Sequence, residues 1–304
     1  MNGHVRTPFE HIARRVDPQA QLRHAAPLLG GSAAEVHLLE LALPDGRAEK
    51  VVVRQHGAAD RAQNPHIAAD EFRLLSRLQA HGVAAPRPYF ADETNRILST
   101  PYIVVQFVEG APEAYPATVP DFAQPVAAAL RRVHAAAPAA FAFLPHAAEH
   151  LRHKLAHPPP ELDETLQEGH VRALLNAHLA LLEERPLALL HGDFWSGNLI
   201  WQHGRLAAII DWEDACLGNP LADVGNARLE LLWKFGVEHM TAFTEAYRQH
   251  DPFAPVVLAF WDLAAALRAA HKLSAWGLDA VTEQRMIVQH REFVVQAQRV
   301  FAAP

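Results

Sequence analysis

The chain has 304 residues, half of them hydrophobic and a fifth charged, which is the composition of a folded globular protein with material for two domains. With 27 Lys and Arg against 34 Asp and Glu, its net charge of −7 argues against a nucleic-acid binder. No apolar run reaches the roughly 18–20 residues of a membrane span, and the N-terminus lacks the apolar region of a signal peptide. A single cysteine, Cys216, excludes a disulfide scaffold and indicates a reducing compartment, so we expect a cytoplasmic protein that binds neither nucleic acid nor membrane.

The first hundred residues predict several strands and one helix, separated by strong turn signals such as Gly30-Gly31-Ser32 and Pro44-Asp45-Gly46. Alternating or β-branched runs predict strands that end at Leu28-Leu29 and that span 35–43, 50–54 and 102–107. Apolar residues at the helical period predict a helix over 65–79. The proline-containing segment 111–120 shows no period and predicts a connector, so we expect one domain over residues 1–109 and a second over 110–304.

The second part is dominated by helical patterns. We predict helices over 122–134 and 162–184, then short strands over 187–190, 199–201 and 206–210, and further helices from Leu221 onward. The layout is therefore a small α+β lobe, a connector and a larger, mostly helical lobe.

Twenty histidines raise the question of metal binding. The best cluster, at spacings of four, three and four, lines one face of a predicted helix: His146, His150, His153 and His157. A helical histidine pair at such a spacing can chelate a metal, but no carboxylate or cysteine is placed to complete a tight site. The pattern therefore favours a solvated helix face.

The residues with the clearest chemistry are His191-Gly192-Asp193-Phe194-Trp195-Ser196-Gly197-Asn198, followed by Ile209-Ile210-Asp211. Apolar strands precede Asp193 and Asp211, and a hairpin turn at His203-Gly204 separates the two segments. Asp, Asn and Gly also populate ordinary turns, but this joint pattern is more specific. The oxygens of Asp193, Asn198 and Asp211 are expected to converge, and Mg²⁺ with phosphate oxygens needs such ligands. The pattern predicts phosphoryl transfer.

With these residues in view, the chain resembles the aminoglycoside phosphotransferase and choline kinase-like family, whose members have a protein-kinase-like fold. The family's catalytic loop matches at His191, Gly192, Asp193 and Asn198, and its metal-binding aspartate falls on Asp211. The resemblance implies an α+β, two-lobed fold, with a small lobe of antiparallel sheet plus helix. It also implies transfer of the γ-phosphate of Mg-ATP, with GTP possible, in which Asp193 is catalytic and Asn198 and Asp211 hold Mg²⁺.

The same resemblance implies a nucleotide site in residues 1–109. Its expected members are a short glycine loop, a cation with its carboxylate partner, and a hinge whose backbone binds adenine: Gly30, Gly31, Ser32, Arg54, Glu71, Gln106 and Val108. Arg54 stands where the family pattern has Lys, but a guanidinium still binds phosphate and carboxylate. Lys50 shares its strand face by two-residue alternation and is the alternative cation.

A small hydroxylated acceptor is favoured over a protein. Gly192 replaces the Arg of protein kinases, and the chain passes quickly from Asp211 to helix, which leaves no room for a peptide platform. We expect Asp223 to brace the catalytic loop and His134 to be a packing residue.

The kind of acceptor is left open among aminoglycosides, sugars and amino-alcohols. Acidic candidates for binding a polycation are Glu213, Asp214, Glu230 and Asp262. A trimethylammonium acceptor would need an aromatic cage, for which the candidates are Trp233, Trp261 and Trp276, although core packing is the commoner role of such residues.

Two other classes of function compete with the kinase. A nucleotide-binding pseudokinase that acts as a sensor is suggested by Arg54 and by the incomplete glycine loop, but the intact Asp193, Asn198 and Asp211 argue against it. A metal-dependent hydrolase needs histidine ligands near Asp193, and only His191 is close in sequence.

Overall fold

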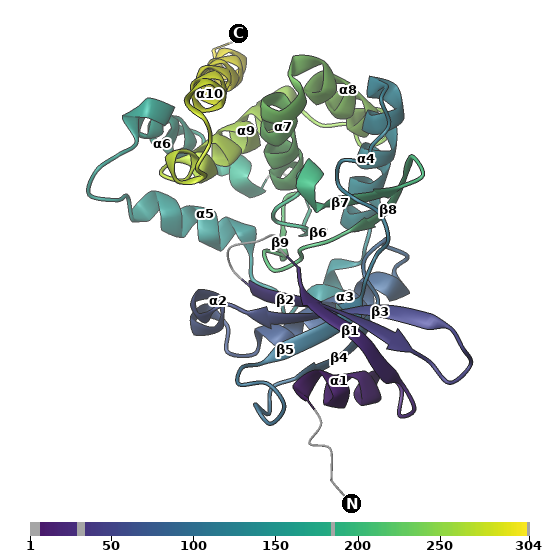
Figure 1. The fold of residues 1–304 in the computed structure, drawn as a ribbon. Coiled ribbons are helices and arrows are strands. Elements are labelled where there is room, and N and C mark those ends of the chain that lie inside the picture. Colours follow the sequence, from purple (N-terminus) through teal and green to yellow (C-terminus); the bar gives the residue numbers. More distant parts are fainter. Residues whose placement is uncertain (1–6, 29–33, 184–185, 303–304) are drawn as a thin grey trace, which may run out of the picture. The chain divides into compact units, whose positions relative to one another are not determined.

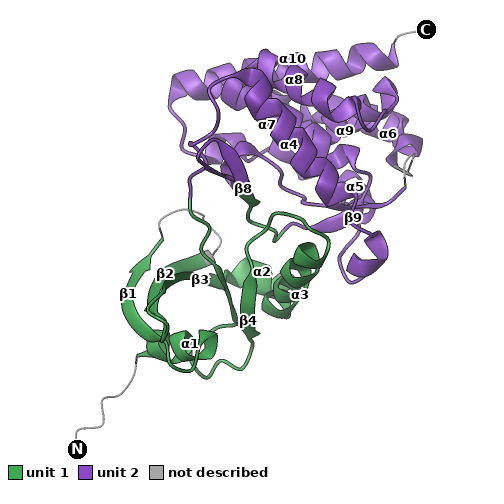
Figure 2. Ribbon diagram, turned by 90° about the vertical axis from the view of Figure 1, so that its right-hand side faces the viewer, with its two compact units in different colours: residues 1–109, 208–213 green, residues 110–207, 214–304 purple. Residues whose placement is uncertain are grey.

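The computed structural model describes residues 7–28, 34–183 and 186–302 (Figure 1). These residues belong to two compact units. The first unit comprises 1–109 and 208–213, and the second comprises 110–207 and 214–304 (Figure 2). One unit is built around an antiparallel sheet and the other is mostly helical, so the predicted α+β class is confirmed.

The first unit contains one five-stranded antiparallel sheet in the order β1-β2-β3-β5-β4. Its strands are β1 Gln21–Pro27, β2 Ala34–Ala42, β3 Ala48–His56, β4 Pro88–Asp92 and β5 Tyr102–Gln106. Its helices are α1 Pro8–Val16, α2 Ala58–Gln63 and α3 Ile67–Ala80. The predicted strands over 35–43, 50–54 and 102–107 and the helix over 65–79 correspond to β2, β3, β5 and α3, whereas α1, α2 and β4 were not predicted.

Helix α1 begins with a capping box. The hydroxyl of Thr7 accepts the Glu10 backbone N–H, and the Glu10 carboxylate accepts the Thr7 backbone N–H at 2.7 Å. The apolar residues Ile12 and Ala13 are fully buried against one face of β2, β3 and β5. Because the box satisfies the otherwise unpaired N–H groups at the helix start, it marks where α1 begins.

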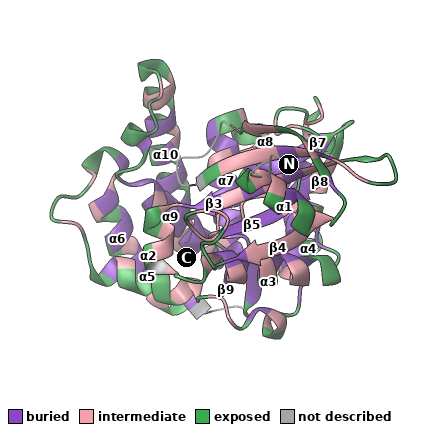
Figure 3. Cartoon of the chain, turned by 60° about the horizontal axis from the view of Figure 1, so that its bottom comes forward, coloured by how far each residue is buried: buried purple, intermediate pink, exposed green. Residues whose placement is uncertain are grey.

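The opposite face of the sheet carries the functional candidates. Val51 and Val53 belong to the core beneath α1, and two-residue alternation turns Arg54 and His56 to the other face. Helix α3 packs against β3, β4 and β5 there. The middle of β5 is buried on both faces (Figure 3).

Residues 208–213 join the first unit although they follow it by a hundred residues in sequence. The backbone N–H of Ile209 donates to the carbonyl of Ala84 at 2.8 Å, and the Trp212 indole N–H donates back to the carbonyl of Ile209 at 2.9 Å. This segment carries Asp211 to the same unit as Arg54.

The second unit consists mainly of helices with two small two-stranded sheets, β6-β9 and β7-β8. Its helices are α4 Val119–His134, α5 Ala147–Ala156, α6 Glu168–Ala177, α7 Leu221–Phe235, α8 Val237–Arg248, α9 Pro255–Ala269 and α10 Ala280–Phe301. Its strands are β6 Ala188–Leu190, β7 Leu199–Gln202, β8 Arg205–Ile209, whose last residues belong to the first unit, and β9 Cys216–Gly218. The predicted hairpin is present, and both turn residues, His203 and Gly204, have positive φ, as a type I′ turn requires.

The predicted continuous helix over 162–184 is wrong. Gln167 has a φ of 58°, in the left-handed region, which separates a short 3₁₀ turn from α6. The Asp163 side chain accepts the Leu166 N–H and the Glu168 carboxylate accepts the Asp163 N–H, so these side chains stabilise the break.

Helix α9 is buried on all sides over residues 257–267, since it packs against α6, α7 and α10. No helix in the described part of the chain is long and apolar enough to cross a membrane.

Candidate active site

The segment 191–198 follows β6 and is shaped by a glycine. Gly192 has a φ of 84°, and a Cβ there would lie 2.0 Å from the carbonyl oxygen of Asp214. The left-handed conformation and the close approach both require glycine. The sequence pattern explained Gly192 only by comparison with protein kinases; the structure adds this steric reason.

Asp223, at the start of α7, braces this segment as predicted. Its carboxylate accepts the backbone N–H groups of His191 at 2.7 Å and Gly192 at 2.9 Å, and it contacts Nε2 of His134 at 3.1 Å. Burial by itself would raise the pKa of Asp223, but the hydrogen bonds and charge of its partners outweigh burial and lower it. His134 therefore does more than pack, because it also contacts the Tyr247 hydroxyl through Nδ1 at 2.7 Å.

Asp193 is held from several sides yet reaches solvent. Its backbone N–H donates to Nδ1 of the fully buried His191, and its backbone carbonyl accepts Nδ2 of Asn198 at 3.0 Å. The same amide nitrogen lies 3.4 Å from Oδ2 of Asp193. The Asp193 side chain is 36% exposed whereas Asn198 is buried, so a rigid support presents one accessible carboxylate.

A cation that the sequence analysis missed reaches the same loop. Arg268, in the last turn of α9, donates through Nη1 to the Gly192 carbonyl and through Nη2 to Oδ1 of Asp193 at 3.3 Å. Its Nη2 also lies 3.6 Å from the Asp214 carboxylate. No local pattern marks Arg268, because 75 residues separate it from Asp193.

The acidic candidates for acceptor binding differ in their burial and in their partners. Burial raises the pKa of Glu230 to about 7, and the charge of Asp193 adds to the effect while Arg268 only partly offsets it. Asp214 is 58% exposed. By contrast, Asp262 is a buried partner of Arg228 at 2.9 Å, which gives it a structural role.

The first unit holds the predicted cation and its carboxylate partner. Arg54 on β3 donates to Glu71 on α3 at 3.0 Å, and Nε2 of the buried His56 contacts the other Glu71 oxygen at 2.6 Å. Burial acts to raise the pKa of Glu71, but Arg54 and His56 outweigh it and lower the pKa to about 2. The predicted Arg54–Glu71 pair is therefore present.

The same guanidinium also binds the segment 208–213. Nη2 of Arg54 donates to the carboxylate of Asp211 at 2.8 Å and to that of Glu213. Asp211 has a φ of 65°, a backbone conformation that is sparsely populated outside glycine and that aspartate tolerates better than most residues. Glu213 is thus engaged within the first unit.

The structure describes some of the remaining nucleotide-site candidates but not all of them. Gly30, Gly31 and Ser32 lie outside the described residues. Gln106 ends β5 and its N–H donates to the carbonyl of Arg87, while Val108 follows it and is half-buried. Lys50, the alternative cation, binds Glu109 at 2.9 Å.

The next question is how the candidate residues for a histidine metal site and for an aromatic cage are arranged. In the described part of the chain, no three His, Cys, Asp or Glu side chains are arranged to hold a metal, the four histidines near α5 included. Trp233 and Trp261 are buried, and the Trp233 indole N–H donates to a backbone carbonyl, so both are core residues. Trp276 meets Trp233 edge-on at 5.8 Å.

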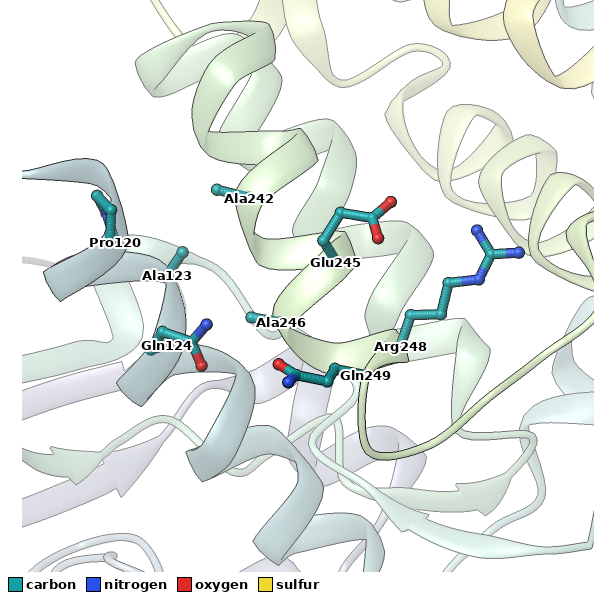
Figure 4. Close-up of a pocket in the computed structure, with 8 residues that line it drawn as sticks. All are labelled: Pro120, Ala123, Gln124, Ala242, Glu245, Ala246, Arg248 and Gln249. Carbon is teal, nitrogen blue, oxygen red and sulfur yellow. The ribbon is translucent and has the colours of Figure 1, made fainter.

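A pocket of about 590 Å³ lies between α4 and α8 (Figure 4). It is lined by Pro120, Ala123, Gln124, Ala242, Glu245, Ala246, Arg248 and Gln249. None of these is a predicted site residue.

Comparison with known proteins shows the family to which this chain belongs. The model of a family described as "Phosphotransferase enzyme family" matches residues 27–261. Hygromycin-B 4-O-kinase of Escherichia coli is 35% identical over 95 residues, which cover 31% of this chain and 27% of that enzyme. The match thus spans little more than a quarter of that relative.

Solved structures share the fold at low identity. A macrolide 2'-phosphotransferase type I covers 100% of both chains with a TM-score of 0.66 at 16% identity. A thermostable mutant of aminoglycoside phosphotransferase APH(4)-Ia, in a ternary complex with ADP and hygromycin B, has a TM-score of 0.62 at 17% identity and covers 97% of this chain and 96% of its own. APH(2'')-IIIa with GDP and kanamycin has a TM-score of 0.65 at 16% identity, over 96% of this chain and 98% of its own.

Proposed function

Because this chain belongs to the phosphotransferase enzyme family, we propose that it transfers the γ-phosphoryl group of Mg-ATP, with GTP as the alternative donor, to a hydroxyl group of a small acceptor. Family membership confirms a phosphotransferase family, and the alcohol group as acceptor is part of the proposal. The donor nucleotide, the metal, the acceptor and the role of each residue are the proposal.

The braced loop of Asp193 carries the proposal. Its carboxylate is accessible, while the groups that hold the loop, His191, Asn198 and Asp223, are nearly or fully buried. Asp193 is the residue that orients the acceptor hydroxyl and accepts its proton. Catalysis of phosphoryl transfer depends mainly on positioning and charge stabilisation, and such a loop supplies the positioning.

The ligand chemistry of Asn198 and Asp211 fits a hard divalent cation. The Asn198 Nδ2 donates to the Asp193 carbonyl, so its Oδ1 is the end of the amide that can act as a ligand. The Asp211 carboxylate is 39% exposed and supplies the anionic oxygen. When bound, Mg²⁺ neutralises charge on the phosphate oxygens.

The nucleotide site is proposed from residues of the first unit. Arg54, held by Glu71, binds phosphate oxygens, and the backbone at Gln106 and Val108 binds the base. The retained Arg54–Glu71 pair supports this assignment. The role expected for Gly30, Gly31 and Ser32 concerns residues outside the described part of the chain. The structural relatives in complex with ADP or GDP support a purine nucleotide.

The acceptor is proposed to be a hydroxylated molecule of aminoglycoside, sugar or amino-alcohol type. Hygromycin B and kanamycin are bound in two structural relatives. In this chain Trp195 is 37% exposed, two residues after Asp193, and offers an apolar face to a ring. Asp214 and Glu230 supply carboxyl groups in the same unit. The pseudokinase alternative is not favoured, since Arg54 forms the ion pair expected of a working site.

The first experiment is a thermal-shift titration with ATP and GTP, each with Mg²⁺ and with a chelator. A ligand present at about 100 times its Kd stabilises the native protein by about 2.7 kcal/mol. We expect Mg-ATP or Mg-GTP to raise the melting temperature more than the metal-free nucleotide does. No stabilisation by either nucleotide at millimolar concentration contradicts the proposal.

The second experiment separates the roles of the two aspartates. Asp193→Asn should leave the calorimetric affinity for Mg-ATP nearly unchanged while transfer to a panel of hydroxylated acceptors collapses. Asp211→Asn should weaken both, because it removes the anionic metal ligand. Loss of Mg-ATP binding in Asp193→Asn, with normal behaviour of Asp211→Asn, would reverse the assignment.

A further inference from the structure

The loop from His191 to Asn198 contains no lysine or arginine. The cation that contacts its aspartate comes instead from α9. Arg268 uses two different nitrogens, Nη1 for the Gly192 carbonyl and Nη2 for Oδ1 of Asp193. A planar fork can hold a backbone and a carboxylate at once, which a lysine ammonium does less well.

The backbone that carries Arg268 is itself held in place. Nζ of Lys154 on α5 donates to the Leu267 carbonyl at 2.8 Å, and Nε2 of the fully buried His290 on α10 lies 3.2 Å from the Ala266 carbonyl. These two carbonyls belong to the last turn of α9, where carbonyls have no partner within the helix. Two neighbouring helices therefore fix the turn from which Arg268 extends.

Arg268 supplies a guanidinium group, whereas its neighbour Lys154 supplies an ammonium group. Guanidinium groups stay protonated across the working pH range. Burial lowers the pKa of Lys154 to about 8, and the nearby cations Lys272, Arg172 and Arg268 contribute to this shift. Besides the Gly192 carbonyl, Nη2 of Arg268 lies 3.3 Å from the carboxylate of Asp193 and 3.6 Å from that of Asp214.

We propose that Arg268 is a positioning residue for phosphoryl transfer, which ties the catalytic loop to the end of α9 and orients the carboxylate of Asp193. The inference rests on the proposed role of Asp193. Arg268 acts through that aspartate: its two hydrogen bonds set the rotation of the carboxylate and the position of the loop backbone. A displacement of about 1 Å at a reacting group can cost about a hundredfold in rate, so this tether has a kinetic effect.

The variants are Arg268→Ala, Arg268→Lys and, as a matched control, Arg291→Ala. Arg291 also donates to a backbone carbonyl, that of Thr165 at 3.0 Å, but it lies on α10 and touches no loop residue in the described structure. The readouts are hydrogen exchange of residues 191–198, nucleotide affinity by calorimetry, and kcat and KM for transfer to an acceptor or, without one, to water.

We expect Arg268→Ala to speed exchange in the loop and to lower kcat about a hundredfold, with nucleotide affinity within about twofold of the wild type. Arg268→Lys should keep part of the rate. Guanidinium at about 50 mM, far below denaturing concentrations, should restore part of the rate to Arg268→Ala and none to Arg291→Ala. A purely structural defect has no reason to respond to this cation.

A double-mutant cycle tests whether Arg268 acts through Asp193. In an Asp193→Asn background, replacing Arg268 should cause little further loss of rate, because residues that act as a unit are not additive. Additive losses, absence of rescue, or unchanged loop exchange in Arg268→Ala would each overturn the proposal. If wild-type protein transfers phosphate to no acceptor and not to water, the proposed function fails and the kinetic role with it, whereas loop exchange still reports whether the tether exists.

Discussion

Glu71 offers a quantitative test of the nucleotide-site geometry. Its carboxylate is 8% exposed and binds Arg54 at 3.0 Å and His56 at 2.6 Å. The perturbation is Glu71→Gln, which keeps the shape of the side chain and removes its charge. Arg54 is left with Asp211 and Glu213, and the buried His56 loses its anionic partner.

The expected loss of folding free energy follows from the pKa of Glu71. A value lowered from 4.5 to about 2 corresponds, at about 1.36 kcal/mol per pH unit, to about 3 kcal/mol of folding free energy. Because the folded-state pKa lies below the unfolded one, this stability is fully present above pH 4.5 and is lost as the pH falls toward 2. By about pH 3.5 the contribution should have fallen to about 2 kcal/mol.

The assay is urea unfolding of wild type, Glu71→Gln and the control Glu35→Gln at about pH 7, 5.5 and 3.5, which bracket the window in which Glu71 titrates. Glu35 lies on β2 and is 69% exposed, so its replacement should change stability by less than about 0.5 kcal/mol. The difference in free energy of unfolding between wild type and Glu71→Gln should be the same at pH 7 and pH 5.5 and smaller at pH 3.5. A difference below about 1 kcal/mol at neutral pH, or one that grows on acidification, would refute the reasoning.

Three further predictions concern the second unit. Gly192→Ala should destabilise the native protein by about 2–3 kcal/mol in thermal unfolding, since it combines a positive φ with a clash against the backbone. Gly204→Ala should destabilise it less, because Gly204 has a positive φ but open space around it. Equal losses of stability in the two variants would contradict this. Asp223→Asn should lower the transfer rate without changing calorimetric nucleotide affinity. The two backbone N–H groups of the loop bind different oxygens of Asp223, and an amide would put an NH₂ group in place of one of them. A parallel rise in Kd would argue for a different role. Asp262→Ala should lower the free energy of unfolding in urea by about 3–5 kcal/mol, because it leaves the buried charge of Arg228 without its carboxylate. Adding Arg228→Met to this variant should recover much of the lost stability. No recovery would show that the pair does more than compensate a buried charge.

Several features could be predicted because their signals are local. The hairpin turn at His203-Gly204 and the strands β2 and β3 follow from turn chemistry and two-residue alternation. The residues Asp193, Asn198 and Asp211 carry the resemblance to the family, because a motif preserves the order and separation of residues that a site must present.

Other local features were missed or misjudged. The capping box at Thr7 and Glu10 was available in the sequence and marks α1. The break at Gln167 was harder to predict, because glutamine is an ordinary helix residue and its positive φ depends on hydrogen bonds made by Asp163 and Glu168.

The sequence by itself determined the α+β layout, which follows from short-range periodicity, and the motif around Asp193, whose resemblance to a known family implied the enzyme family. Only the tertiary structure decided which charges meet. It paired Arg268 with Asp193 across 75 residues, Arg228 with Asp262 in the core, and Arg54 with Asp211 across 157 residues. Arginines and aspartates carry no local mark of their partner; the pairing depends on which helix ends and strand faces the packing of apolar residues brings together.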